Sequence, residues 1–339
     1  IMAACILTDE AVHLTNVPNL QDIQTMIKVL ESLGVKADIS NLSQNKLTVC
    51  YEDINKNIAE YDLVRKMRAS VLILGPLLAR KKEASVSLPG GCAIGARPID
   101  MHIDALKKLG AEFVLDSGYV NCKAPKGLKG NKIDLKKISV GASENIIMAA
   151  SLASGESEIN NIAIEPEVID LIKCLKSMGS EIDFIGDRKI LIQGKENLRG
   201  TTHEVIPDRI EAGTYMIAGA LIGNNLKIQN IEPDHMQNIL NVFEELKIDF
   251  KLNKDSISIS KSDIEVGVNL QTEEYPGFPT DLQAQIMVLL SKSKKNSSII
   301  ENIFENRFMH VPELNRMGTQ ISIEGNKSII SPSSELIGA

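Results

Sequence analysis

Residues 164–179 read IEPEVIDLIKCLKSMG, and this stretch decides the fold. Its apolar side chains recur at intervals of three and four residues, the spacing of an amphipathic helix with one buried stripe. Pro166 has a fixed φ suited to the first helical turn, and Gly179 can take the left-handed conformation that ends a helix. The stretch therefore predicts a helix that packs one face against a sheet and ends in a glycine turn.

The same pattern occurs five times along the chain. The other copies are NVPNLQDIQTMIKVLESLG (16–34), GARPIDMHIDALKKLG (95–110), IEPDHMQNILNVFEELK (231–247) and NRFMHVPELNRMG (306–318). Their final residues follow one another at intervals of 68 to 76 residues, and only the fourth copy ends in Lys247 in place of glycine. An internal repeat of this length indicates a chain built from similar supersecondary units.

A second helix, apolar on nearly all sides and so expected to be buried, precedes each later copy. These helices are VLILGPLLARK (71–81), NIIMAASLASG (145–155), RIEAGTYMIAGALIG (209–223) and DLQAQIMVLLS (281–291). A strand follows each of them, two short strands follow each helix-ending turn, and a further strand leads into the next unit. The repeat is therefore a βαβαββ unit of roughly 70 residues, too small to close a core alone, so neighbouring units should share cores. The chain begins inside the first buried helix and stops soon after the fifth unit, and we expect it to be cut at both ends.

Composition narrows the possible functions. The 339 residues carry a formal net charge of −7, which offers no general surface for nucleic acid or anionic membrane. No apolar run is long enough to cross a bilayer, and we expect no signal peptide. Five scattered cysteines without CxxC spacing fit a reducing cytoplasm, and five histidines without an HxxxH pair predict no metal site.

The segment SLPGGCAIGARPIDMHI (87–103) is the first candidate for chemistry. A glycine-rich loop that leads into a helix N-terminus suits an anion, and Arg97 would add a bidentate contact to phosphate or carboxylate. Cys92 is either an unreactive small thiol in a flexible turn or a thiolate made reactive by the neighbouring arginine and helix.

Two further loops precede buried helices. KKISVGASEN (136–145) either binds a second anion or is a simple turn with Ser143 as the helix cap. In EYPGFPTDLQAQ (274–285), Asp281 is either an N-cap or a general base.

Other charged residues have structural interpretations by default. The clusters PDRIEAGT (207–214) and FENRFMHVPEL (304–314) are expected to form salt bridges, and His102 and His310 to be structural histidines. Arg68, at the head of a buried helix, is a better anion ligand than an average surface arginine.

Together these segments resemble the bacterial UDP-N-acetylglucosamine 1-carboxyvinyltransferase family over essentially the whole chain. The matching signatures, in the family's order, are LPGGCAIGARPID, VGASENIIMAA, PDRIEAGT, YPGFPTDLQAQ and FENRFMHVPELNRMG. The resemblance implies a two-domain α/β enolpyruvyl transferase fold, an inside-out α/β barrel of repeated βαβαββ units around buried helices. It implies transfer of the enolpyruvyl group of phosphoenolpyruvate to the 3′-hydroxyl of UDP-N-acetylglucosamine, without a cofactor or metal. This reaction begins peptidoglycan precursor synthesis, so roles in cell-wall biogenesis, cell shape and cell division are implied too.

The resemblance also assigns site residues. Cys92 matches the cysteine that protonates C3 and that fosfomycin alkylates, Asp281 the carboxylate that accepts the hydroxyl proton, and Arg97 a residue that grips both substrates. The remaining substrate contacts implied are Arg68, Pro98, Ile99, Asp100, Met101, Lys137, Ser139, Val140 and Ile303. The substrates are the only partners implied, with no nucleic acid or membrane, and no oligomeric state is predicted.

We expect a first domain over 1–205, with three units and the cysteine loop 87–97, and a second over 206–339, with two units. The family's Lys-Asn pair and an arginine of its sixth unit, both implied to bind phosphoenolpyruvate, have no counterpart here, so exposed apolar helix surface and weak activity are expected. Two alternatives remain: the related shikimate-pathway transferase, which lacks the PGGC loop, and a non-catalytic homologue that binds UDP-sugar without turnover. A cysteine hydrolase is rejected, because nothing orients His102 as a base.

Overall fold

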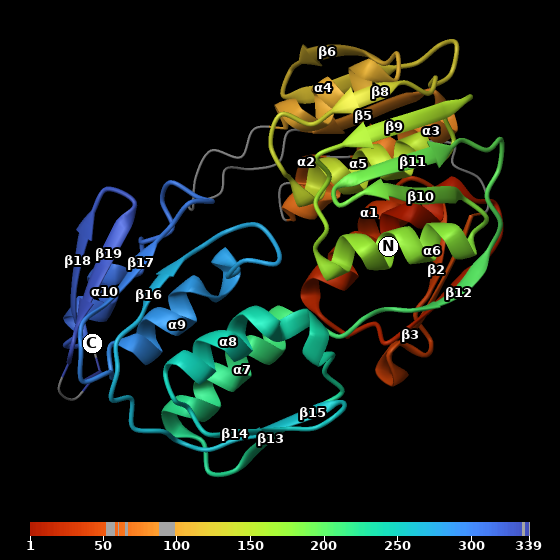
Figure 1. Ribbon diagram of the computed structural model, residues 1–339. Coiled ribbons are helices and arrows are strands. Elements are labelled where there is room, and N and C mark those ends of the chain that lie inside the picture. Colours follow the sequence, from red (N-terminus) through yellow and green to blue (C-terminus); the bar gives the residue numbers. More distant parts are fainter. Residues whose placement is uncertain (52–57, 60, 65–66, 88–98, 334–335, 339) are drawn as a thin grey trace. The chain divides into compact units, whose positions relative to one another are not determined.

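The computed structural model describes residues 1–51, 58–59, 61–64, 67–87, 99–333 and 336–338. The chain divides into two compact units, one ending at Ile206 and the other beginning at Pro207. Both contain the repeated mixture of helices and short strands that the sequence predicts (Figure 1). The repeats of βαβαββ type are therefore confirmed as the building blocks of an α/β fold.

Among its described residues, unit 1 consists of three four-stranded sheets and the helices between them. Its strands are β1 (Val12–Thr15), β2 (Val35–Asp38), β3 (Lys46–Tyr51), β4 (Ile58–Ala59), β5 (Glu83–Ser87), β6 (Glu112–Asp116), β7 (Tyr119–Lys123), β8 (Lys132–Asp134), β9 (Glu156–Asn160), β10 (Glu181–Gly186), β11 (Lys189–Gln193) and β12 (Thr201–Glu204). Its helices are η1 (Met2–Leu7), α1 (Gln21–Ser32), η2 (Leu42–Gln44), α2 (Tyr61–Val64), η3 (Arg68–Ile73), α3 (Leu74–Lys81), α4 (Asp100–Lys108), α5 (Val140–Ala150) and α6 (Pro166–Ser177).

The described part of unit 2 has the same arrangement of helices and strands, with two sheets. Its strands are β13 (Leu226–Gln229), β14 (Phe250–Leu252), β15 (Ser256–Ile259), β16 (Asn269–Gln271), β17 (Ser297–Ile300), β18 (Gln320–Glu324) and β19 (Lys327–Ser331). Its helices are α7 (Arg209–Ile222), η4 (Pro233–Met236), α8 (Gln237–Glu245), η5 (Thr280–Leu282), α9 (Gln283–Leu290) and α10 (Val311–Arg316).

One strand order recurs in four of the sheets. A leading strand pairs in parallel with the strand that follows the buried helix, and two antiparallel pairings complete the sheet, as in β4-β5-β7-β6, β8-β9-β11-β10 and β16-β17-β19-β18. In the first sheet the leading position belongs to β12, which pairs in parallel with β1 although it follows the third repeat. Unit 1 is thus closed on itself by a strand from its own C-terminal end. Sheet β13-β15-β14 has three strands among the described residues.

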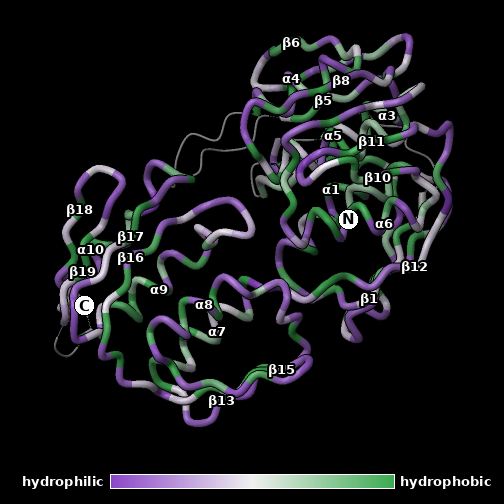
Figure 2. Tube along the Cα trace, viewed as in Figure 1, coloured by the Kyte–Doolittle hydropathy of each residue, from purple (hydrophilic) through white to green (hydrophobic). Residues whose placement is uncertain are grey.

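The buried helix of the third repeat, α5, lies at the centre of unit 1. It contacts α3, α4 and α6, and Ile146, Ile147 and Ala149 are each 0% exposed. Burying one isoleucine side chain contributes about 1.5–3 kcal/mol relative to leaving it exposed. The tube of α5 is accordingly apolar along most of its length (Figure 2). The expectation of a helix buried on all sides is confirmed here.

Helix α7 differs from that expectation. It contacts α9, and Met216 is fully buried, but Tyr215 and Ile222 are 55% and 82% exposed. The physical reason is that one buried helix, α9, packs beside α7 in the described part of unit 2, whereas α5 has three helical neighbours. An apolar helix surface is therefore left exposed in unit 2.

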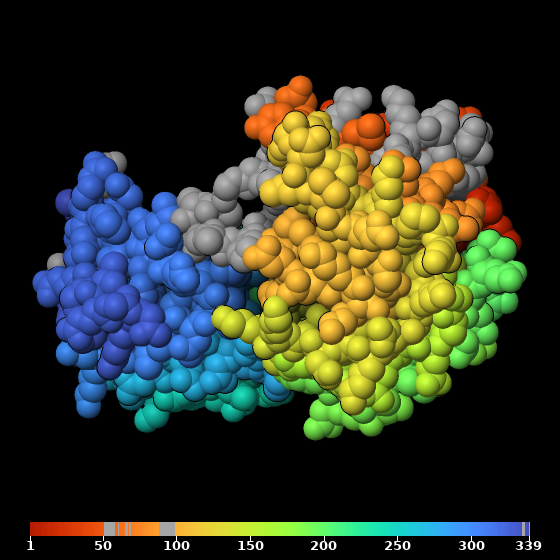
Figure 3. Space-filling model, turned by 90° about the horizontal axis from the view of Figure 1, so that it is seen from above, coloured from red at the N-terminus to blue at the C-terminus, as the bar shows by residue number. Residues whose placement is uncertain are grey.

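Edge strands also expose apolar side chains. Val114 and Leu115 on β6 are 65% and 67% exposed, and Phe184 and Ile185 on β10 are nearly half exposed. The hairpin that contains β6 lies on the outside of unit 1, where its atoms are yellow in Figure 3. Both edge strands thus expose consecutive apolar side chains, which point to opposite faces of the sheet.

The helix-ending turns take the left-handed conformation in all five repeats. Gly34, Gly110, Gly179 and Gly318 have φ between 93° and 100°, and Lys247, which replaces glycine in the fourth repeat, has φ 57°. A residue with a Cβ atom is strained in this region by roughly 1–2 kcal/mol. The turn is therefore imposed by the repeat even where the sequence lacks glycine.

Glu144 of α5 faces two acidic residues of the segment that begins α6. Its burial, together with the carboxylates of Glu167 and Glu165, raises the pKa of Glu144 from 4.5 to about 7. The buried helix surface therefore favours the neutral form of this carboxyl group.

We expect Gly110→Ala to lower the free energy of unfolding by about 1 kcal/mol and Lys247→Gly to raise it by about 0.5–1 kcal/mol. A Cβ atom at Gly110 would meet no heavy atom within 4 Å, so the cost would come from the backbone alone. Denaturant unfolding of both variants measures the two effects. Equal stability of all three proteins would contradict an imposed left-handed turn.

Glu144→Gln should stabilise the protein in a pH-dependent way. Below about pH 4 the carboxyl group is protonated in both states and costs nothing, but as pH rises toward 7 only the unfolded chain ionises freely. The substitution should therefore gain about 1–3 kcal/mol at pH 7.5 relative to its effect at pH 4.5. Thermal unfolding at the two pH values measures this difference, with the exposed Glu112→Gln as the control. A gain that does not change with pH would refute it.

Candidate functional site

The predicted site residues fall into three groups. Cys92, Arg97 and Pro98 lie outside the described residues, and Arg68 begins η3. The other predicted residues lie near two helix starts of unit 1, or in η5 and a loop of unit 2: Ile99, Asp100, Met101, Lys137, Ser139, Val140, Asp281 and Ile303.

In unit 1 the two predicted segments open two helices. Ile99 is the buried N-cap residue of α4, and Asp100 begins its first turn. Ser139 is the N-cap of α5, where its hydroxyl accepts a hydrogen bond from the Ala142 N–H at 3.4 Å. Helix N-termini carry partial positive charge and suit anionic groups.

The interpretation of Ser143 as the cap of α5 is wrong. Ser143 is fully buried within α5, and its Oγ accepts a hydrogen bond from the Ala163 N–H at 2.9 Å. Ser143 therefore fixes the loop before α6 to α5. Ser139, four residues earlier, has the capping geometry. Lys137 is exposed next to this cap, and its neighbour Lys136 pairs with Asp104 of α4 at 2.6 Å.

A buried network connects the two segments. The Asn145 Nδ2 group donates to the Val71 carbonyl at 3.0 Å and contacts His102 Nδ1 at 2.9 Å, while Asn145 Oδ1 accepts from the Gly75 N–H at 2.7 Å. The two backbone partners fix the orientation of the amide, so Nδ1 of His102 must be the acceptor and the ring carries its proton on Nε2. A Cβ atom at Gly141 would lie 3.2 Å from the His102 ring. His102 therefore holds the start of α4 against the start of α5, which agrees with its expected structural role.

In unit 2 the predicted residues Asp281 and Ile303 belong to one hydrogen-bonded cluster. Asp281 lies in η5, and its carboxylate accepts a hydrogen bond from Arg307 Nη2 at 2.7 Å. The N-cap of α9 is Leu282, so the interpretation of Asp281 as a helix cap is wrong. The Asp281 side chain is 59% exposed, and it can therefore meet a ligand while the largely buried Arg307 orients it.

Sequence reasoning assigned Arg307 a structural salt bridge and so missed its place beside Asp281. The arginine does form an ion pair, but with a predicted site residue 26 positions away. Its guanidinium also lies over the Phe304 ring, 5.6 Å from the centroid. No local pattern in 304–314 could have identified this partner, because the pairing depends on two loops meeting in the folded unit.

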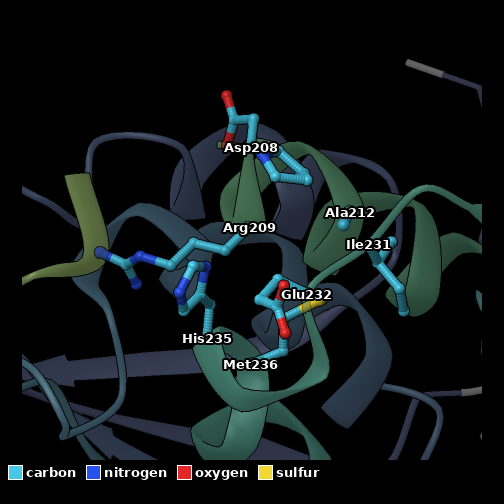
Figure 4. A pocket seen from close by; sticks show the side chains of 8 residues that line it. Asp208, Arg209, Ala212, Ile231, Glu232, His235 and Met236 are labelled. Carbon is cyan, nitrogen blue, oxygen red and sulfur yellow. The ribbon is translucent and has the colours of Figure 1, made fainter. Parts of the chain in front are cut away.

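Asp208 and Arg209 act at the start of α7. Asp208 is the N-cap and accepts hydrogen bonds from the N–H groups of Ile210 and Glu211 at 2.8 and 3.0 Å, whereas the Arg209 guanidinium lies 5.5 Å from the Tyr275 ring centroid. The structure thus gives Asp208 a capping role, where the sequence predicted a salt bridge. A shallow depression lies here; its lining is Pro207, Asp208, Arg209, Ala212, Ile231, Glu232, His235 and Met236 (Figure 4). It contains none of the residues that the resemblance assigns to the substrates.

His310 is partly buried at the N-cap position of α10. Desolvation by burial, opposed by a backbone hydrogen bond, lowers the pKa of His310 from its usual 6.5. This agrees with a structural histidine that stays neutral.

In the described ranges, no group of three or more His, Cys, Asp or Glu residues is arranged to hold a metal ion. Within the same ranges, no helix is both long enough and apolar enough to cross a membrane.

Solved structures show the same fold. An enolpyruvyl transferase from Streptomyces tendae, NikO, matches with a TM-score of 0.89 and 20% identity over 98% of this chain and 78% of its own. EPSP synthase from Acinetobacter baumannii matches with a TM-score of 0.70 and 15% identity over 98% and 80% of the two chains. At these identities the likeness establishes the enolpyruvyl transferase fold alone.

Sequence relatives are much closer. UDP-N-acetylglucosamine 1-carboxyvinyltransferase of Pelagibacter ubique is 49% identical over 97% of this chain and 78% of its own, and that of Koribacter versatilis is 48% identical over 100% and 78%. The family model of EPSP synthase (3-phosphoshikimate 1-carboxyvinyltransferase) matches residues 1–339. The chain therefore belongs to the family of EPSP synthase-like enolpyruvyl transferases, and within it to the UDP-N-acetylglucosamine 1-carboxyvinyltransferases.

Proposed function

We propose that this protein transfers the enolpyruvyl group of phosphoenolpyruvate to the 3′-hydroxyl of UDP-N-acetylglucosamine and releases phosphate. The observation that carries the proposal is the identity of nearly one half to transferases of this name over almost the whole chain. The Asp281–Arg307 pair beside the loop of Ile303 is consistent with it. The reaction supplies the first committed intermediate of peptidoglycan synthesis, and we propose roles for the protein in cell-wall growth, cell shape and cell division. We propose that the protein acts in the cytoplasm.

The reaction needs a proton donor, a proton acceptor and stabilisation of charge. The 3′-oxygen bonds to C2 of phosphoenolpyruvate while C3 gains a proton, which gives a tetrahedral phosphoketal. Loss of a proton from C3 and cleavage of the C2–O bond to phosphate then restore the double bond. No electrons are exchanged with a cofactor, so the protein's own acid and base groups can carry the chemistry.

Asp281 fits the role of the base that accepts the proton of the 3′-hydroxyl. Its carboxylate is 59% exposed and is oriented from one side by Arg307 at 2.7 Å. An oriented carboxylate that stays accessible to a hydroxyl group is what general base catalysis requires.

Cys92 and Arg97 are proposed to act on phosphoenolpyruvate, Cys92 as the donor of the proton to C3 and Arg97 as the anion ligand. For the nucleotide sugar we propose Arg68, Arg97, Pro98, Ile99, Asp100, Met101, Lys137, Ser139, Val140, Asp281 and Ile303. The two helix starts of unit 1, joined through His102 and Asn145, support a role in binding the uridine and diphosphate.

We also infer that residues 1–205 and 206–339 are separate domains, which the division of the chain at Ile206 supports.

Phosphate release from the purified chain should require both substrates and fall at least 100-fold in Cys92→Ala and in Asp281→Asn, because each removes a proton-transfer group. A coupled phosphate assay measures this, with Asp104→Asn, which changes a surface carboxylate of unit 1, as the control. Binding of UDP-N-acetylglucosamine without any phosphate release would contradict the proposal and favour a binding protein without turnover.

Fosfomycin should add once to the chain, at Cys92, when UDP-N-acetylglucosamine is present. Cys5 and Cys122 are buried, and burial raises the pKa of each thiol to about 12, so neither supplies a thiolate near neutral pH. Peptide mass spectrometry locates the adduct. An unmodified Cys92, or modification spread over several cysteines, would count against the assignment.

A further inference from the structure

Glu301, which directly follows β17, is a buried carboxylate with four hydrogen-bond donors. Glu301 is only 3% exposed. The carboxylate accepts from the hydroxyls of Thr272 and Thr280 at 2.8 and 3.0 Å, and from the N–H groups of Ile303 and Phe304 at 2.9 and 3.1 Å. Burying a carboxylate is costly unless hydrogen bonds replace its hydration, and here all four bonds come from nearby protein groups.

The repeat shows that this arrangement is a departure from the common design. After β1, β9 and β13 the chain turns through an asparagine in the left-handed conformation, at Asn16, Asn161 and Asn230, with φ of 57°, 61° and 57°. The N–H of the next residue then bonds to a carbonyl of the hairpin turn in the same sheet.

The fifth repeat omits that turn. No residue from Ser297 to Phe304, all of which the structure describes, has a positive φ. The Glu301 N–H itself bonds to the hairpin carbonyl, that of Asn326, at 2.8 Å. The loop that follows is consequently shaped by the Glu301 carboxylate, through the N–H groups of Ile303 and Phe304, in place of an asparagine turn.

The same carboxylate connects the two unit 2 segments of the proposed site. Oε1 holds the loop of Ile303, and Oε2 holds Thr280, the residue before Asp281. Arg307 also connects these two segments, since it pairs with Asp281 and its guanidinium lies over the Phe304 ring. Small shifts of the carboxylate would therefore move the base and the loop together.

We propose that Glu301 is a positioning residue that sets the separation of Asp281 and Ile303 and thereby the affinity for the nucleotide sugar. The inference rests on the proposed function, because it assigns both neighbours to UDP-N-acetylglucosamine. Glu301 itself need not touch a substrate.

The test compares Glu301→Gln and Thr280→Val with a matched control, Thr319→Val. Thr319 is also buried in unit 2, where its hydroxyl donates to Asn315 Oδ1 at 2.9 Å, so its substitution removes the same kind of bond away from the site. Steady-state phosphate release and calorimetric binding of UDP-N-acetylglucosamine are measured for each folded variant.

We expect Glu301→Gln and Thr280→Val to raise the Kd and KM for UDP-N-acetylglucosamine about five- to tenfold, with the KM for phosphoenolpyruvate changed less than twofold. A merely structural role would lower the active fraction, and so kcat, while leaving KM and Kd as in Thr319→Val. That outcome would overturn the inference while leaving the proposed function intact. A wild-type chain that neither binds nor turns over UDP-N-acetylglucosamine would instead refute the proposed function itself.

Discussion

Burial of the apolar helix α5 is the constraint on which the rest of unit 1 depends. A single βαβαββ unit covers such a helix on one side only, because its sheet and amphipathic helix form one layer each. Unit 1 meets the constraint by grouping repeats so that α3, α4 and α6 pack against α5. The leading strand of the first sheet, β12, comes from the C-terminal end of the unit and packs against α6. Helices of the second and third repeats thus cover α5 together.

The buried helices can contact one another only if the polar groups between them are satisfied. Asn145 is 0% exposed, yet each of its side-chain polar atoms has a partner, and these partners lie on η3, α3 and α4. A residue of any other shape would leave the Gly75 N–H or the Val71 carbonyl without that bond, at a cost of about 1–3 kcal/mol for each unsatisfied group. The same network brings the starts of α4 and α5 together. In unit 1 the contacts of Asn145 therefore serve both the packing of the core and the geometry of the proposed nucleotide site.

Periodicity and turn residues were enough to predict the repeat from the sequence. Five helix stripes and the glycine turns that end four of them predict the order of elements, since both signals are local. The left-handed Lys247 was harder, because a lysine carries no turn signal and adopts φ 57° only under the demands of the repeat. The cap interpretations that the sequence left open for Ser143 and Asp281 fail for a related reason: each residue lies near a helix start, but its side chain bonds to a distant partner, Ala163 or Arg307. The fold was therefore predictable from short-range patterns, whereas the contacts of the site depend on residues far apart in the sequence.

Departures from a repeat can point to function when packing does not require them. The asparagine turn after β1, β9 and β13 is sufficient to connect a strand to the following helix, so the core gives no reason to replace it after β17. Replacing it with Glu301 places a charge in the interior, which costs free energy unless the loop is built around it. The four donors show that the loop is built around it, and two of them belong to the loop of Ile303 while a third precedes Asp281. A costly local change whose bonds all converge on one small region is better explained by the demands of that region than by those of the fold.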